Sequence, residues 1–162
     1  MIEQTLVLVK PDGVKRGLIG EIIKRFEQRG LKIVAMKMFH ADDELAKAHY
    51  REDIEQRYGK EVREALTEYL KSVPVVAFVV EGVNSIAVVR KICGATYPGE
   101  ADLGTIRGDF AHVSKVHANN VNKCHNLVHS SGSPEEAKLE IGLWFKKKEI
   151  YSYNLSHEEH IR

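Results

Sequence analysis

Residues 74–80, Pro-Val-Val-Ala-Phe-Val-Val, decide how this chain folds. The run is almost wholly apolar and rich in β-branched valine, and Pro74 and Gly82 bound it. An apolar run without polar alternation is typical of a strand that is buried on both faces. We therefore expect a sheet that is covered on each side.

Segments with a strand or helix period surround this run. We expect strands at 5–9 and 31–39 and a strand that ends at 127–128. We expect helices at 18–29, from 42 or 43 toward 50, at 61–71, at 85–93 and from 133. A turn is expected at 10–13 and a loop at 96–109. This order predicts an α+β fold with an antiparallel or mixed sheet of about four strands covered by helices. Residues 111–125 show no clear period.

Composition restricts the class of protein. The 162 residues are 43% hydrophobic and 29% charged, which is typical of a single globular domain and excludes disordered and fibrous classes. The 24 basic and 23 acidic side chains give a net charge of +1, which argues against nucleic acid or a membrane surface as a partner. Any anion site must therefore be local.

Cysteine usage and hydropathy predict a cytoplasmic protein. Cys93 and Cys124 do not form a Cys-x-x-Cys pair, which suits a reducing compartment. The apolar run near the N-terminus is too short for a signal sequence, and no segment approaches the length of a membrane span.

A polar junction precedes the last predicted helix. Ser133 suits the N-cap, Pro134 suits the first helical position, and Glu136 completes a capping box. Spacing places Glu136 and Glu140 on a different side of this helix from its apolar residues. His129 is expected at the turn between the strand and the helix.

The role of His129 stays open on chemistry alone. It could be a reactive imidazole, a buried core residue, a turn residue or one half of an incidental pair with His125. As a nucleophile it would need one ring nitrogen free and the other held by an acceptor, for which Glu140 is the candidate. A metal site with His112 and His117 is disfavoured, because the spacing of these histidines matches no closed zinc pattern.

Phosphate binding would have to rely on side chains. The sequence lacks both GxxxxGK[ST] and GxGxxG. Candidate side chains are Lys10, Arg90, Thr96 and Arg107. Each of them alone is more readily explained as a solvated surface group. The segment 105–110, however, places an arginine, a glycine and an aspartate together in a predicted loop.

Six motifs in register resemble the nucleoside diphosphate kinase family, in a longer form similar to its archaeal members. They are 10–18 (KPDGVKRGL), 49–50 (HY), Arg90 with 94–96 (GAT), 104–110 (GTIRGDF), 126–129 (NLVH) and 140–145 (EIGLWF). The resemblance covers nearly the whole chain up to about residue 151. It implies a ferredoxin-like fold, with a kinase domain at 1–150 and a tail at 151–162 that either frays or lies at a subunit contact.

The resemblance also implies a reaction and its residues. The γ-phosphate of a nucleoside triphosphate would pass to a nucleoside diphosphate by a ping-pong mechanism through a phosphohistidine, with Mg²⁺ carried by the nucleotide. A homo-oligomer is implied, with a hexamer favoured over a tetramer. The implied roles are His129 as nucleophile, Glu140 as its orienting carboxylate, Ser131 as support for Glu140, Tyr50 as lining, Lys10 and Asn126 on the ribose and transferring phosphate, and Arg90, Thr96 and Arg107 on the β- and γ-phosphates.

This chain departs from the family pattern at three places. Gly132 stands where the family has an acid that helps to bind Mg²⁺. The segment 111–125 has more residues than the corresponding segment of the commoner family members. A length difference near 53–62 leaves open whether Tyr58, Val62 or neither stacks on the base.

Two other functions compete with the kinase. A ferredoxin-like nucleic-acid module would need a basic face and clustered sheet aromatics, which the sequence lacks. An inactive scaffold would most simply have lost one of the matched polar residues, and all of these are present.

Overall fold

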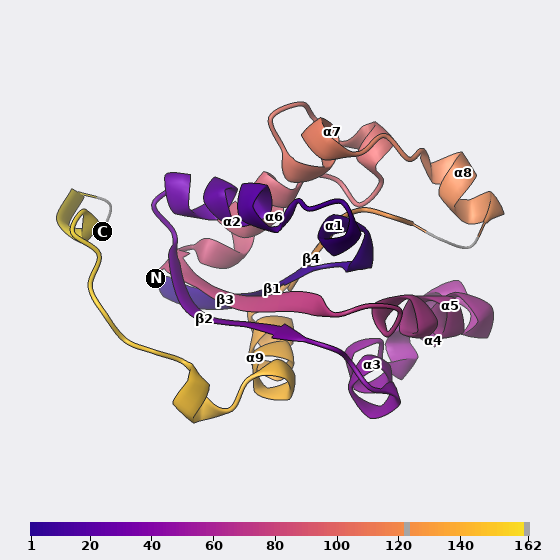
Figure 1. The fold of residues 1–162 in the computed structure, drawn as a ribbon, viewed down its shortest axis with the longest axis horizontal. Helices are drawn as coiled ribbons and strands as arrows, with labels where there is room; N and C mark the ends of the chain where they lie inside the picture. Colours follow the sequence, from indigo (N-terminus) through magenta and orange to yellow (C-terminus); the bar gives the residue numbers. More distant parts are fainter. Residues whose placement is uncertain (122–123, 161–162) are drawn as a thin grey trace.

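The chain folds around one antiparallel sheet, as predicted. The computed structural model describes residues 1–121 and 124–160. The strand order is β2, β3, β1, β4 (Figure 1). The strands are β1 (Ile2–Val9), β2 (Lys32–Phe39), β3 (Val75–Val83) and β4 (Val128–Ser130). The run at 74–80 therefore supplies an inner strand.

Strand β3 is buried on both of its faces. Ala77 and Val79 belong to one hydrophobic core, and Phe78 and Val80 belong to the core on the opposite side. The ring of Phe78 meets that of Phe26 edge to face, with centroids 5.6 Å apart. The unbroken apolar run is thus explained by two cores that share one strand.

Helices cover the two faces of the sheet (Figure 1). One face carries α2 (Ile19–Gln28), α6 (Ser85–Cys93) and α7 (Ile106–Phe110), and the other carries α3 (Asp43–His49), α5 (Lys60–Leu70) and α9 (Pro134–Trp144). The shorter elements are α1 (Pro11–Lys15), α4 (Glu52–Tyr58), α8 (Lys115–Asn120), η1 (Pro98–Glu100), η2 (Lys147–Glu149) and η3 (Glu158–His160). Among the described residues, no helix has the length and hydropathy to cross a bilayer.

The turn predicted at 10–13 is wrong, because helix α1 begins at Pro11. Gly13 serves close packing instead of a turn. A Cβ atom there would lie 2.8 Å from Cγ1 of Val9 and 3.0 Å from the carbonyl oxygen of Leu127. The glycine thus lets α1 approach the chain just before β4.

The loop predicted at 96–109 is wrong in part, since η1 and α7 lie within or across it. Helix α7 begins after Thr105, whose hydroxyl accepts a 3.0 Å hydrogen bond from the Gly108 amide. Within 111–125, Ser114 caps α8 in the same way. These two short helices were not predicted, because the signals for their starts are side-chain caps and not an apolar period.

His129 lies within strand β4, opposite Leu8, and not in the turn predicted after the strand. The strand begins at Val128 and pairs with β1 at only three positions. As a consequence, sheet hydrogen bonding fixes the backbone of this residue.

Helix α9 begins as predicted, with the Ser133 hydroxyl accepting from the Glu136 amide. The predicted capping box is wrong in its second hydrogen bond, because the Glu136 carboxylate accepts from the Gly132 amide at 2.5 Å and not from the amide of Ser133. The prediction that Glu140 lies away from the core is wrong: it is buried beside Ala137 and Trp144. Polar partners in the interior, described below, account for its position.

Asp12 fixes the backbone that leads into β4. Leu127 has a positive φ of 68°, a conformation that is unfavourable for a branched side chain. Its amide donates to Oδ2 of Asp12 at 3.0 Å, and its carbonyl accepts from the Lys10 amide at 2.8 Å. The Tyr69 hydroxyl donates to the other carboxylate oxygen of Asp12.

The described part of the tail runs along the edge strand β2 of its own chain. The Tyr151 amide donates to the Val34 carbonyl at 2.8 Å, and the Tyr153 hydroxyl donates to the Ile33 carbonyl at 2.7 Å. Lys32 donates to the Tyr153 carbonyl at 2.8 Å. Whether the tail also contacts a neighbouring subunit stays a prediction.

Candidate active site

A cavity of about 920 Å³ brings most of the predicted site residues together. The polar residues on its wall come from β4, α4, α6, α7, α8, α9 and the segments between elements, and Lys10 follows directly after β1. The predicted site residues that line it are Lys10, Tyr50, Arg90, Thr96, Arg107, Asn126 and His129. The two remaining members of the predicted set, Ser131 and Glu140, lie behind His129.

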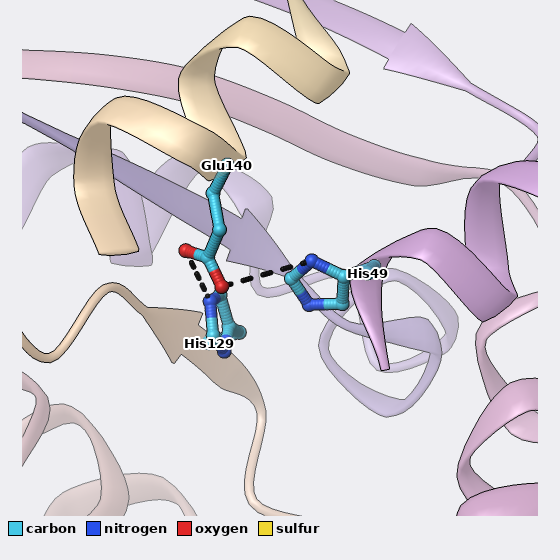
Figure 2. Close-up of side chains that lie close together, drawn as sticks. All are labelled: His49, His129 and Glu140. Atoms are coloured by element: carbon cyan, nitrogen blue, oxygen red, sulfur yellow. Dashed lines mark hydrogen bonds and ion pairs between the residues drawn. The ribbon is translucent and has the colours of Figure 1, made fainter. Parts of the chain in front are cut away.

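Glu140 holds one side of the His129 ring. Its Oε2 lies 2.9 Å from Nε2 of His129 (Figure 2). The same oxygen accepts a 2.6 Å hydrogen bond from the Ser131 hydroxyl. Since an ionised carboxylate only accepts, Nε2 of His129 must carry the proton. The lone pair of the neutral ring is then on Nδ1, the nitrogen on the opposite side of the imidazole.

The Glu140 carboxyl is buried yet ionised. Burial raises the pKa of this carboxyl, but the hydrogen bonds from His129 and Ser131, with the attraction that the His129 ring exerts when it is protonated, outweigh that effect and lower it. A carboxylate in this position both fixes the tautomer of the imidazole and stabilises positive charge that develops on it.

Lys10 and Asn126 form a buried polar pair on the cavity wall. Nζ of Lys10 donates to Oδ1 of Asn126 at 2.9 Å, and Nδ2 of Asn126 donates to the Thr96 carbonyl at 2.9 Å. Burial lowers the pKa of Lys10 to about 8, with Asp12 opposing and Arg107 adding to the effect. An anion in the cavity would restore the charged form of this lysine.

Arg107 joins two segments of the cavity wall. Its guanidinium donates to the carbonyls of Gly94 at 2.7 Å, Ala95 at 3.4 Å, Asn126 at 3.1 Å and Val128 at 2.7 Å. An arginine has five N–H donors, so roughly one is left for a ligand. The structure therefore gives this residue a large part in holding the wall together.

Arg90 and Thr96 are exposed on the cavity wall, whereas Tyr50 is buried. Burial and the nearby Glu140 carboxylate raise the pKa of Tyr50, so its hydroxyl stays protonated at neutral pH. Of these three residues only Arg90 is cationic, and its exposed guanidinium is open to a ligand in the cavity.

Gly132 and Glu136 also line the cavity. A Cβ atom at Gly132 would lie 2.8 Å from Oε2 of Glu136 and 3.3 Å from Nη1 of Arg90. The Glu136 carboxylate thus fills space that a side chain at position 132 would need. In this chain the acid near Arg90 comes from the first turn of α9 and not from the preceding loop.

The two candidates for stacking on a base, Tyr58 and Val62, both lie on the wall of the same cavity. Ala118 and Asn119 of α8 line it as well. Part of the segment 111–125, whose path was not predicted, therefore lines the cavity, while residues 122 and 123 lie outside the described residues.

Three further residues near the site were missed from the sequence. Asp12 and His49 fall inside motifs quoted above, but only the fold gives them partners. Trp144 donates its indole N–H to Nδ1 of His49 at 3.3 Å. No local signal marks this contact, because 95 positions separate the two residues.

Within 1–121 and 124–160, ligand atoms of His49, His129 and Glu140 lie within 4.8 Å of one another. His112, His117 and His125 do not belong to this group. The Trp144 indole occupies Nδ1 of His49, and Oε2 of Glu140 accepts from both His129 and Ser131. The grouping is thus accounted for as a hydrogen-bonded network.

Comparison with known proteins identifies the family. The family model described as "Nucleoside diphosphate kinase" matches residues 3–150. A nucleoside diphosphate kinase of Pyrococcus furiosus is 51% identical over 152 residues, which is 94% of this chain and 88% of the relative. Another from Borreliella burgdorferi is 48% identical over 160 residues, covering 98% of this chain and 96% of the relative.

A solved structure from Borrelia burgdorferi, described as a transition-state mimic of nucleoside diphosphate kinase with bound vanadate and ADP, has a similar fold. It superposes with a TM-score of 0.96 at 47% identity, over 99% of this chain and 96% of that one. The likeness therefore extends to a relative that was captured with a mimic of phosphoryl transfer.

Proposed function

This chain belongs to the nucleoside diphosphate kinase family, and we propose that His129 carries the phosphoryl group in its reaction. The reaction moves the γ-phosphate of a nucleoside triphosphate to a nucleoside diphosphate. The observation that supports His129 is its hydrogen bond to Glu140, which occupies Nε2 and leaves the Nδ1 lone pair for the cavity.

Each turnover consists of two half-reactions. In the first, Nδ1 of His129 attacks the γ-phosphorus, the bond from that phosphorus to the bridging oxygen breaks, and the nucleoside diphosphate leaves. In the second, a terminal phosphate oxygen of another nucleoside diphosphate attacks the phosphorus of the phosphohistidine, the bond from that phosphorus to Nδ1 breaks, and its electron pair restores the neutral ring. Glu140 stabilises the positive charge of the ring between the two steps. Donor and acceptor therefore use one cavity in turn.

Basic and polar side chains on the cavity wall bind the phosphates. Arg90, Thr96 and the remaining donor of Arg107 hold the β- and γ-phosphates, while Lys10 and Asn126 reach the ribose and the transferring phosphate. Mg²⁺ arrives on the nucleotide phosphates, since it needs few protein ligands there. Positioning and charge stabilisation are the main requirements of a loose phosphoryl-transfer transition state.

The base lies toward the side of the cavity that Tyr58 and Val62 line. Tyr58 is 61% exposed, so its ring is accessible for stacking. Stacking on an aromatic face tolerates any base, because every base has a π-face. Tyr50 serves as lining close to His129.

The kinase domain comprises residues 1–150, and residues 151–162 follow it as a tail, of which 161 and 162 lie outside the described residues. A cytoplasmic location suits Cys93 and Cys124, which are both free thiols. Family resemblance favours a homo-oligomer.

We expect a hexamer, with a tetramer as the alternative. Met36 and Met38, each 57% exposed on the edge strand β2, support burial of that region in an assembly. Static light scattering measures the mass directly. A hexamer of 18.3 kDa chains would have a mass of about 110 kDa, and a monomer mass would contradict the expectation.

Incubation of the protein with γ-labelled ATP and Mg²⁺ tests the proposed nucleophile. We expect stoichiometric label on the protein that is acid-labile and base-stable, and that ADP discharges. His129→Ala should abolish the label and the turnover. Label that persists in this variant would contradict the role of His129, and nucleotide binding without any label on the wild-type chain would favour an inactive scaffold.

Nucleotide affinity should fall as pH rises through about 8, the pKa of Lys10 in the free protein. Deprotonation removes a charge that attracts phosphate, so Kd for ADP measured by calorimetry should rise roughly ten-fold from pH 7 to pH 9. The stability of the protein changes with pH in the opposite direction. Burial of charged Lys10 lowers the free energy of unfolding below pH 8, and this loss disappears as pH rises toward 10.5.

Lys10→Arg is the matched control for this pH dependence, because arginine stays charged throughout the range. Its Kd should change little between the two pH values. An unchanged Kd in the wild-type protein, or an equal rise in both proteins, would remove Lys10 as the cause.

A further inference from the structure

A second histidine lies directly behind His129. His49 is the last residue of α3 and is buried. Its ring meets the rings of His129 and Trp144 edge to face, with centroids 4.5 Å and 5.7 Å away (Figure 2 shows the two histidines with Glu140). His49 therefore contacts the ring of His129 and lies beside Glu140, the residue that orients that ring.

Trp144 determines which nitrogen of His49 carries the proton. Its indole Nε1–H donates to Nδ1 of His49 at 3.3 Å. An indole N–H can only donate, so Nδ1 must be the acceptor and the proton of neutral His49 is on Nε2. Burial, together with the neighbouring His129, lowers the pKa of His49 to about 3, which keeps the ring neutral at pH 7.

This tautomer matters because Nδ1 of His49 also faces Glu140. The distance from Nδ1 to Oε1 of Glu140 is 3.8 Å, which is too long for a hydrogen bond. With a neutral ring there is no ion pair either. The other oxygen, Oε2, binds both His129 and Ser131. If Nδ1 of His49 carried a proton, it would become a donor aimed at the same carboxylate.

We propose that Trp144 and His49 form a tautomer lock that reserves the Glu140 carboxylate for His129. By occupying Nδ1 of His49, the indole N–H prevents that nitrogen from donating to Glu140. Both residues act as positioning residues, since neither would touch the substrate. The inference rests on the proposed function, because the ring it protects is the one that would carry the phosphoryl group.

The tautomer can be measured on the unphosphorylated wild-type protein. Two-bond ¹H–¹⁵N correlation spectra distinguish a protonated ring nitrogen from an acceptor, and His49→Gln identifies the His49 signals by their loss. We expect the proton on Nε2 and an unprotonated Nδ1. A proton on Nδ1 of His49 in the wild-type protein would overturn the proposal.

The lock itself is tested by removing one hydrogen-bond donor. Trp144 is the single tryptophan of the chain, so biosynthetic replacement by β-(3-benzothienyl)alanine, which has sulfur in place of N–H, changes this position alone. We expect an Nδ1–H population at His49, a kcat roughly ten-fold lower and a KM for nucleotide within about two-fold of wild type. Retention of the Nε2–H tautomer together with an unchanged kcat would overturn the proposal.

Phe39→Leu serves as the matched control. The Phe39 ring packs edge to face on Trp144 at 6.4 Å and is 40% exposed, so its loss disturbs the same packing without touching the N–H donor. This variant should keep both the wild-type tautomer and kcat. An equal fall in kcat in both proteins would assign the effect to packing and contradict the lock.

The two proposals fail in different ways. Absence of a phosphoenzyme in the wild-type protein would remove the proposed function, whereas the tautomer of His49 is read without nucleotide. If the benzothienyl protein does not fold, the wild-type spectrum still decides which nitrogen of His49 is protonated.

Discussion

The hydrogen bond between His129 and Glu140 is the interaction on which the site depends. It joins strand β4, which pairs with β1 over only three positions, to helix α9 on the face of the sheet. A buried carboxylate needs partners, and the imidazole and the Ser131 hydroxyl supply them. One contact thereby connects an edge strand to the core and sets the tautomer of the imidazole that we propose carries the phosphoryl group.

The rest of the site consists of groups held in place before any ligand binds. Arg107 commits most of its donors to backbone carbonyls, and Asp12 holds Leu127 in a left-handed conformation next to β4. Lys10 is buried at a cost that an anionic ligand would relieve. Preorganised charge of this kind suits phosphoryl transfer, because the protein need not reorganise as the reaction proceeds.

Sequence reasoning found the sheet and most of the helices because apolar periods are local. It missed α1, α4, α7 and α8, which have only five to seven residues each and are too short to show an apolar period. It also put Glu140 on the polar side of α9, since a carboxylate at that spacing is usually solvated and only the fold shows its buried partners. The contact between Trp144 and His49 likewise depends on how α9 packs against α3.

The position of phosphorus on the His129 ring tests the central claim most directly. A ³¹P–¹H correlation spectrum of the phosphorylated protein separates the two possible phosphohistidine isomers. Because Glu140 occupies Nε2, phosphorus should be bonded to Nδ1. Phosphorus on Nε2 would mean that the carboxylate does not hold this nitrogen during the reaction, and it would contradict the role of Glu140 in orienting the ring.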